Sequence, residues 1–422
     1  MHYSFYNLLL WTSLLCCFPL ALFKPKIKHY FNYRLGSTLD KACSRTLGNK
    51  HPVWIQALSV GEVLSVLPLV RLLKMDNLSI FFTASTITGH AIACQKLKHM
   101  VKGIGYFPLD LAPIINRYLY RIKPHLVVLV ETDIWPNFLY CVKRYRTPCL
   151  LINARISHKS YKRYQLIKPF FKKVINLFDF IGTQRAEDTE RLKSLGASSS
   201  KVKVMGNMKF DCLIPEFKKE KQMALRKQLG ISLGQKVWVA GSTHKGEDEI
   251  LFRTLKYLLK THPEICLIVA PRHPERFDEV EKLAKKWNFR VESYTKPNKN
   301  STCEVIILDT IGELATIYGL ADFVFIGGSL IPIGGHNPLE AATWGRPIAF
   351  GQYMFNFSEI KTLMIENEAA ISVNNENELI KAMENWLNFP EKAEAIGNRA
   401  LGLVKAHQGA TDRYFDLIKK YL

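Results

Sequence analysis

Three acidic side chains in the first half of the chain follow apolar segments, where a ligand could reach them. Glu62 comes after the turn that ends the apolar run 53–58, and Glu131 and Asp133 follow the apolar run 126–130. A carboxylate in a cleft can deprotonate a hydroxyl, but a glutamate in the first turn of a helix can also simply complement the helix dipole. Position alone favours the dipole role for Glu62. Glu131 ends an apolar strand, so its charge must be paired or functional.

A glycine-rich stretch, 327–342, is the most distinctive segment of the second half. It follows the apolar run Phe323–Ile326, and Asn337 and Pro338 suit the N-cap and the first position of a helix. Free N–H groups at such a helix start favour a phosphate, and the carboxylate of Glu340 could accept ribose hydroxyls. A glycine-rich connector is the alternative for the glycines alone. With Asn-Pro-x-Glu added, the stretch predicts nucleotide binding.

Further polar clusters end other apolar runs of the second half. They span residues 241–244, 271–276 and 310–313. Arg272 and Arg276 could hold a phosphate through paired N–H donors, and Glu313 could bind sugar hydroxyls. One such cluster means little, because loops at strand ends are often polar, but recurrence at successive strand ends is harder to attribute to chance. The sequence has no Asp-x-Asp pair and no His-Glu-x-x-His motif, so we expect no metal.

Apolar strands that alternate with helical segments must position these clusters. The expected strands span 53–58, 79–83, 126–130, 149–153, 180–183 and 202–204 in the first half, and 237–241, 265–270, 305–309, 323–326 and 347–350 in the second. This alternation predicts an α/β fold with two doubly wound, Rossmann-like domains that face a central cleft. The expected divisions are an anchor at 1–34, domains at 35–210 and 234–405, a linker at 211–233 and a C-terminal helix at 406–422.

Charge and cysteine content narrow the partners and the compartment. The 422 residues include 58 Lys and Arg against 37 Asp and Glu, which gives a net charge of +21. This excess favours a polyanionic partner, such as nucleic acid, an anionic membrane surface or a phosphorylated substrate, without choosing among them. The nine cysteines include no Cys-x-x-Cys pair, so we expect neither a disulfide framework nor a structural metal, and a reducing compartment.

The N-terminus predicts an association with a membrane. Phe5–Phe23 is nearly all apolar and is just long enough to span a bilayer, and Lys24, Lys26 and Lys28 follow it. Basic residues after the apolar run favour a cytoplasmic location for the rest of the chain. A helix that lies in the membrane surface is an almost equal alternative, since Pro19 and the aromatic residues suit it.

Six motifs in one order resemble the 3-deoxy-D-manno-octulosonic acid (Kdo) transferases over nearly the whole chain. They are Ser59–Glu62, Glu131–Asn137, Gly206–Asp211, Pro271–Arg276, Gly312–Leu314 and Gly327–Ala342. The resemblance implies the two-domain glycosyltransferase fold called GT-B, the donor CMP-Kdo and the acceptor lipid IVA, a phosphorylated lipid A precursor. It also implies lipopolysaccharide assembly at the cytoplasmic face of the bacterial inner membrane, with no cofactor and no nucleic acid partner.

The resemblance also implies roles for single residues. Glu62 is expected to be the general base, and Glu131 and Lys209 are expected to steady the transition state. The expected CMP-binding residues are Pro271, Arg272, Ile311, Gly312, Glu313, Asn337, Pro338, Leu339 and Glu340. Two departures stand beside them: Asp133 replaces a glutamate of many members, and Asn207-Met208 replaces Ser-Leu.

Together, the residues and the resemblance predict an inverting, metal-independent Kdo transferase. The first domain is expected to bind the acceptor, whose hydroxyl loses its proton to Glu62. Arg272 and the helix that opens at Pro338 are expected to stabilise the departing CMP. A transferase for another nucleotide sugar and a catalytically silent binder of acidic glycolipids remain as alternatives, and the number of Kdo residues added stays open.

Overall fold

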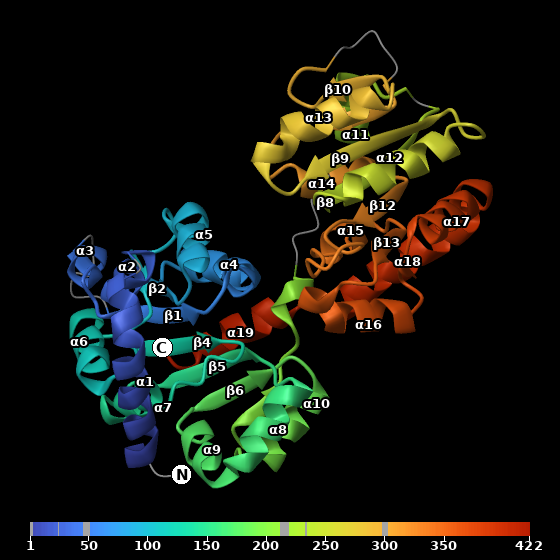
Figure 1. Cartoon of the computed structure of the whole chain (residues 1–422). Helices are drawn as coiled ribbons and strands as arrows, with labels where there is room; N and C mark the ends of the chain where they lie inside the picture. The colour runs from blue at the N-terminus through green and yellow to red at the C-terminus, as the bar shows by residue number, and fades with distance from the viewer. Residues whose placement is uncertain (1–2, 24, 45–50, 212–218, 233, 298–302) are drawn as a thin grey trace. The chain divides into compact units, whose positions relative to one another are not determined.

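The structure is a computed structural model that describes residues 3–23, 25–44, 51–211, 219–232, 234–297 and 303–422. The chain forms two compact units, each with its own sheet (Figure 1), and buried apolar residues form a core in each unit. The first unit comprises Met1–Asp211 together with His407–Leu422, and the second comprises Cys212–Ala406. The first unit is therefore discontinuous in sequence, because the end of the chain returns to it.

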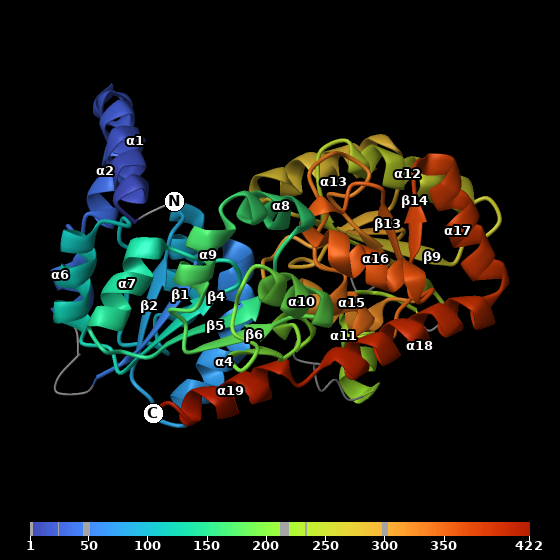
Figure 2. The same cartoon turned by 90° about the horizontal axis from the view of Figure 1, so that it is seen from below.

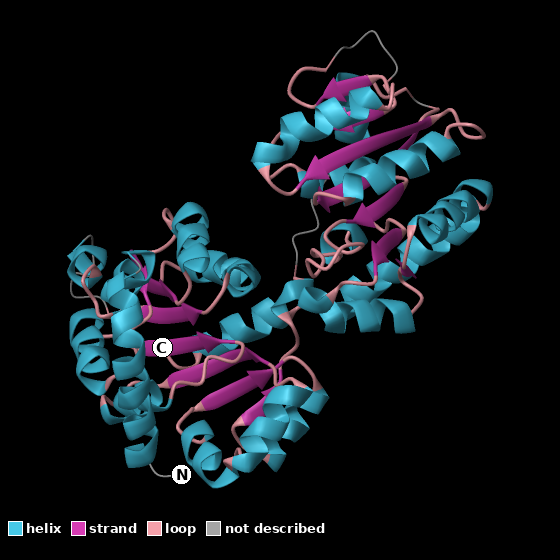
Figure 3. Ribbon diagram, viewed as in Figure 1, coloured by secondary structure: helices cyan, strands magenta, loops and turns pink. Residues whose placement is uncertain are grey.

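The first unit contains a seven-stranded, fully parallel sheet in the order β3-β2-β1-β4-β5-β6-β7. Its strands are β1 Val53–Ala57, β2 Ile80–Ala84, β3 Gly103–Tyr106, β4 Leu126–Val130, β5 Cys149–Ala154, β6 Phe180–Thr183 and β7 Val202–Val204. The strands β1, β2, β4 and β5 are buried along their whole length, because helices cover both faces of the sheet (Figure 3). This double burial explains why these strands are nearly continuous apolar runs in the sequence.

Two sets of helices cover the two faces of this sheet. Their bounds are α4 Val60–Met75, α5 Ile87–Leu97, α6 Ala112–Ile122, α7 Pro136–Arg144, α8 His158–Leu166, α9 Lys168–Ile175, α10 Ala186–Ser194 and α19 Ala410–Lys419, with the 3-10 turn η1 Met208–Phe210. Residues of α6, α7, α9 and α10 share one core cluster, and residues of α4, α5 and α19 share the other. Figure 2 shows α4 and α19 side by side on their face of the sheet.

The second unit repeats the architecture with the strand order β10-β11-β9-β8-β12-β13-β14, again fully parallel. Its strands are β8 Lys236–Thr243, β9 Ile265–Pro271, β10 Val291–Ser293, β11 Val305–Ile307, β12 Phe323–Ile326, β13 Ile348–Gly351 and β14 Ile371–Val373. Its helices are α11 Lys219–Gln228, α12 Glu247–Leu258, α13 Phe277–Lys286, α14 Leu314–Ile317, α15 Leu339–Ala342, α16 Ser358–Glu366, α17 Glu376–Asn388 and α18 Pro390–His407, with 3-10 turns η2 Pro274–Arg276, η3 Tyr318–Leu320 and η4 Phe355–Phe357.

Each sheet has one point where the strand order changes direction. In the first sheet the chain builds β1, β2 and β3 outward and then places β4 on the other side of β1. In the second sheet β12 likewise lies on the side of β8 away from β9. Ligands of open α/β sheets bind at such switch points, beyond the carboxyl ends of the strands. A ligand site is therefore expected at the loops after β1, β4, β8 and β12.

The N-terminal segment forms α1 Tyr3–Phe23, α2 Pro25–Arg34 and α3 Leu39–Ser44. The start of α1 contacts the first unit, since the Tyr6 hydroxyl donates to Asp110 at 2.7 Å and the Asn137 amide donates to Asn7 at 2.6 Å. Within the part of the chain that the structure describes, no helix has the length and apolarity of a membrane span. For residues 14 and 16–29 of the predicted anchor, the side chains lie outside the described part of the chain.

Candidate active site

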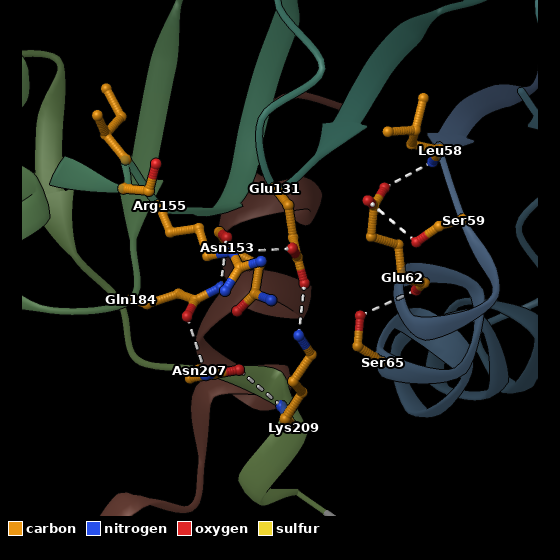
Figure 4. Close-up of polar contacts among 12 residues, drawn as sticks. Leu58, Ser59, Glu62, Ser65, Glu131, Asn153, Arg155, Gln184, Asn207 and Lys209 are labelled. Carbon is orange, nitrogen blue, oxygen red and sulfur yellow. Dashed lines mark hydrogen bonds and ion pairs between the residues drawn. The ribbon is translucent and has the colours of Figure 1, made fainter. Parts of the chain in front are cut away.

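Glu62 lies at the switch point of the first sheet, in the first turn of α4 (Figure 4). Its side chain is only 7 % exposed and bends back to the turn after β1. The backbone N–H of Leu58 donates to Oε2 at 2.5 Å, and the Ser59 hydroxyl donates to Oε1 at 3.3 Å. Burial, together with the charges of Glu131 and Asp133, raises the pKa of Glu62 to about 8. A carboxyl group in this state can take up a proton near neutral pH.

Glu131 lies directly after β4, the neighbour of β1 at the switch point. Its backbone has a φ of +59°, a left-handed conformation that is unusual for a residue other than glycine and is often found at functional sites. The carboxylate is 4 % exposed and forms ion pairs with Lys209 Nζ at 3.0 Å and Arg155 Nε at 3.3 Å. The charge of Glu131, expected to be either paired or functional, is therefore paired, with two cations.

Lys209 reaches Glu131 because a chain of amides holds the turn η1. The side chain of Asn207 accepts the Lys209 N–H at 3.0 Å and donates to Gln184 at 2.9 Å. Gln184 in turn donates to the backbone oxygen of Asn153, whose side-chain oxygen accepts the Met208 N–H at 3.1 Å. Asn207 thus supports the lysine through its own hydrogen bond, as Figure 4 shows.

Asp133 is buried beside these groups and is held by two donors. Gln56 Nε2 donates to it at 2.7 Å and Trp135 Nε1 donates at 3.1 Å. Gln56 is itself fixed by the hydroxyls of Thr83 and Ser85. Burial raises the pKa of Asp133 to about 6. The shorter side chain at this position therefore belongs to a buried hydrogen-bonded network.

The sequence alone does not single out Gln56, Asn153, Arg155 or Gln184 at this site. Asn153 is the one with a visible signal, since it ends a predicted strand. In the structure its backbone has a φ of +53°. The other three are ordinary polar residues whose neighbours are distant in the sequence. Only the strand order brings them to the same edge of the sheet.

In the second unit the two predicted phosphate-binding arginines have different environments. Arg272 follows Pro271 at the end of β9, and its side chain is exposed. Arg276 is buried and is paired with Asp248, and its guanidinium also donates to the backbone oxygen of Thr243. Arg276 therefore has a structural role here, and Arg272 is the arginine available to a ligand.

The remaining predicted CMP-binding residues lie on two loops of the second unit. Ile311 is 69 % exposed, Gly312 has a φ of +99°, and Glu313 immediately precedes α14. The Asn337 side chain accepts the Leu339 N–H at 3.1 Å. Burial raises the pKa of Glu340, whereas Arg272 and Asn337 lower it.

The helix predicted to open at Pro338 needs a correction. It begins at Leu339, with Pro338 just before it, and it spans only four residues, Leu339–Ala342. The chain after it turns at Gly345, which has a φ of +64°. Because few peptide dipoles are aligned in a single turn, little of a helix-dipole contribution to phosphate binding remains.

Two further features lie at the switch point of the second sheet. The side chain of Glu247, fully buried at the start of α12, accepts backbone N–H groups from the glycine-rich loop. The imidazoles of His244 and His336 face each other with their Nε2 atoms 2.9 Å apart. Among the described residues, no three His, Cys, Asp or Glu side chains are grouped as metal ligands.

The chain is similar in sequence to a known family of proteins and to characterised proteins along nearly its whole length. A family model described as 3-deoxy-D-manno-octulosonic-acid transferase (kdotransferase) matches residues 30–212. A protein of Haemophilus influenzae named 3-deoxy-D-manno-octulosonic acid transferase is 35 % identical, over 98 % of this chain and 97 % of its own. A protein of the same name from Chlamydia pneumoniae is 27 % identical, over 99 % and 96 % of the two chains.

Solved structures of more distant proteins share the fold. A glycosyltransferase from Rickettsia africae aligns with a TM-score of 0.56 at 12 % identity, over 88 % of this chain and 98 % of its own. The Anabaena protein HepE in complex with UDP aligns with a TM-score of 0.58 at 14 % identity, over 87 % and 99 %. With the two seven-stranded parallel sheets, these alignments confirm the predicted GT-B type of fold.

Proposed function

Because this chain belongs to the family of 3-deoxy-D-manno-octulosonic acid (Kdo) transferases, we propose that it transfers Kdo from CMP-Kdo to lipid IVA with inversion at the anomeric carbon. The observation that supports this best is the group of charged residues at the switch point of the first sheet. Glu62, Glu131 and Lys209 come from three separate segments, and Glu131 and Lys209 form an ion pair there. Such convergence is unusual for residues with only a structural role.

In this proposal Glu62 is the general base. The acceptor hydroxyl gives its proton to the Glu62 carboxylate as its oxygen attacks the anomeric carbon of Kdo. A pKa near 8 makes Glu62 a better proton acceptor than an exposed glutamate, because the charged form is poorly solvated. The hydrogen bonds from Leu58 and Ser59 hold the carboxylate in a defined orientation.

We propose that Glu131 and Lys209 stabilise the charge that develops in the transition state. The Lys209 ammonium supplies positive charge 3.0 Å from the Glu131 carboxylate, and this pairing limits the net charge of the site. Kdo carries a carboxylate of its own, so a nearby cation would favour its approach. Asp133, with Gln56 and Trp135, would shape the acceptor side of the same edge.

The second unit would bind the CMP part of the donor. The exposed guanidinium of Arg272 can donate paired hydrogen bonds to the phosphate. The backbone at Pro271 and the loop Ile311–Glu313 would lie against the nucleoside. Asn337, Pro338, Leu339 and Glu340 would complete the site, with Glu340 accepting ribose hydroxyls.

We further propose that the protein works at the cytoplasmic face of the bacterial inner membrane, in lipopolysaccharide core assembly. The net charge of +21 favours an anionic surface, and the apolar residues of 5–23 would attach the chain to it. A lipid acceptor also requires an enzyme that can reach the membrane.

The test is single-turnover transfer from CMP-Kdo to lipid IVA by the Glu62→Gln variant. Loss of the base should reduce the rate by about 10²–10⁴-fold, while CMP affinity should stay the same. Glu391→Gln, an exposed first-turn glutamate of α18, is the matched control. Near-normal transfer by Glu62→Gln would leave Glu62 with the dipole role only.

Assays of the wild-type protein alone distinguish the two alternative functions. A panel of nucleotide sugars offered with lipid IVA would show transfer from one other donor if the donor assignment is wrong. An absence of both transfer and donor hydrolysis with every nucleotide sugar would instead favour a silent glycolipid binder.

A further inference from the structure

Two histidines meet at the switch point of the second sheet. His244 follows β8 and His336 lies in the loop after β12, 92 residues later. Their Nε2 atoms are 2.9 Å apart and their rings are nearly parallel, with an interplanar angle of 6°. At this distance one Nε2 carries a hydrogen and the other accepts it. The two rings thus share one proton between them.

The surrounding backbone is shaped around this histidine pair. Gly328 has a φ of +67°, and a Cβ there would lie 3.1 Å from His336 Cδ2 and 3.3 Å from His244 Cδ2. Glu247 fixes the same loop, because its carboxylate accepts the N–H groups of His244, Gly328, Ser329 and Leu330 at 2.7–3.0 Å. A glycine and a buried carboxylate therefore keep the two imidazoles in contact.

Burial and the positive charges around the histidine pair disfavour the binding of a second proton. Burial, together with the charges of the nearby Arg272 and His273, lowers the pKa of His244 to about 4 and that of His336 to about 3. Arg276 adds to the effect on His244. Glu247 is the acidic group in direct contact, and its oxygens already accept four backbone N–H groups. Without a ligand, the pair is neutral at physiological pH.

A bound phosphate would instead favour protonation of the histidine pair. It would bring negative charge beside Arg272 and the histidine pair, and an opposite charge within a few ångströms favours the protonated imidazole. The charge also changes during the proposed reaction. The phosphodiester of CMP-Kdo carries one negative charge, and the phosphomonoester CMP carries close to two at neutral pH.

We propose that the His244–His336 pair is a proton-coupled phosphate receptor that takes up one proton from solvent and donates a hydrogen bond to the departing nucleotide phosphate. This inference rests on the proposed function, which supplies the nucleotide. The bond between the anomeric carbon and the phosphate oxygen breaks, and its electron pair stays on that oxygen. The imidazolium faces the new charge, while the acceptor proton goes to Glu62. With α15 reduced to one turn, the pair supplies positive charge that this helix lacks.

Calorimetry of CMP and cytidine binding at about pH 7.5, in buffers with different ionisation enthalpies, tests the proposal. Wild type should take up a proton with CMP and none with cytidine, because cytidine has no phosphate. His336→Gln and His244→Gln keep a polar group near the Nε2 position but cannot hold a proton there. Each variant should lose the uptake and bind CMP about tenfold to a hundredfold more weakly, with cytidine binding unchanged.

His262→Gln is the matched control, since this histidine precedes β9, at the opposite edge of the second sheet from the pair, and the variant should keep the proton uptake. CMP binding by wild type without proton uptake, or with uptake that survives in both pair variants, would overturn the proposal and leave the CMP site intact. Proton-coupled binding of UMP or AMP in place of CMP, lost in the pair variants, would support the receptor and remove CMP-Kdo as donor. If no nucleotide binds wild type, both proposals fail.

Discussion

At the scale of single residues, the burial of Glu62 makes the stability of the folded protein depend on pH, which an exposed glutamate would not do. The folded chain holds this carboxyl in a poorly solvated place, beside Glu131 and Asp133, and its pKa rises from the usual 4.5 to about 8. The folded protein therefore binds the proton more tightly than the unfolded chain does. Stability from this group is present below its unfolded pKa and is lost as the pH rises through 8. Active sites often carry such a compromise between stability and function.

The Glu62→Gln variant should reveal this compromise without any activity measurement. Glutamine keeps an acceptor for the Leu58 N–H but cannot ionise. The free energy of unfolding of the variant, relative to wild type, should increase by a few kcal/mol as the pH is raised from about 5 to about 9. Denaturant unfolding at several pH values measures it. A difference that stays constant with pH would show that Glu62 ionises normally.

At the scale of elements, the last helix of the chain completes the first unit. The carboxylate of Asp211 accepts the N–H groups of Gly409 at 2.7 Å and Thr411 at 2.6 Å at the start of α19. Further along α19, the buried Tyr414 hydroxyl accepts the Asn153 N–H at 2.9 Å and donates to the Gly182 carbonyl at 3.0 Å. Because Asn153 also holds η1, this helix supports the position of Lys209.

Tyr414→Phe should therefore affect both stability and transfer. The change keeps the ring but leaves the buried Asn153 N–H and Gly182 carbonyl without this partner, which should reduce the free energy of unfolding by about 1–3 kcal/mol. Single-turnover transfer should fall as well, by less than in Glu62→Gln, with CMP affinity unchanged. Tyr421→Phe near the chain end serves as the control. Lower stability with full transfer would separate α19 from the positioning of Lys209.

At the scale of the whole molecule, the excess of positive charge affects binding to surfaces, and the two-unit organisation determines which segments form each core. A net charge of +21 creates a long-range attraction to anionic surfaces that salt screens within about 10 Å at 0.1 M ionic strength. The core of the discontinuous first unit includes residues of the last helix, α19. The second unit is one continuous segment with its own sheet.

Binding to vesicles should consequently depend on salt and on lipid charge. The full-length protein should bind phosphatidylglycerol vesicles more tightly than phosphatidylcholine vesicles, and the difference should shrink as salt is raised. Reversing Lys26 and Lys28 to Glu should weaken binding more than reversing the exposed Lys392 and Lys405 of α18. Sedimentation with vesicles measures this. Equal binding to both lipids at low salt would contradict an electrostatic contribution.

Local patterns in the sequence determined the fold class and the positions of the site loops. A parallel strand covered on both faces must be apolar throughout, so β1, β4, β8 and β12 are visible as apolar runs, and the polar residues after them mark the carboxyl edges. The sequence does not predict β3, β10 and β14. These strands have three or four residues and lie at the outer positions of their sheets, where the apolar signal is weak.

Only the tertiary structure decided which of these residues meet. The ion pair of Glu131 with Lys209, the commitment of Arg276 to Asp248 and the contact of His244 with His336 all join residues far apart in the chain. Local periodicity carries no information on such pairs, because they depend on the order of strands and on where the chain end packs. Burial of Glu62, which raises its pKa, also arises only when β1, β4 and η1 come together around it.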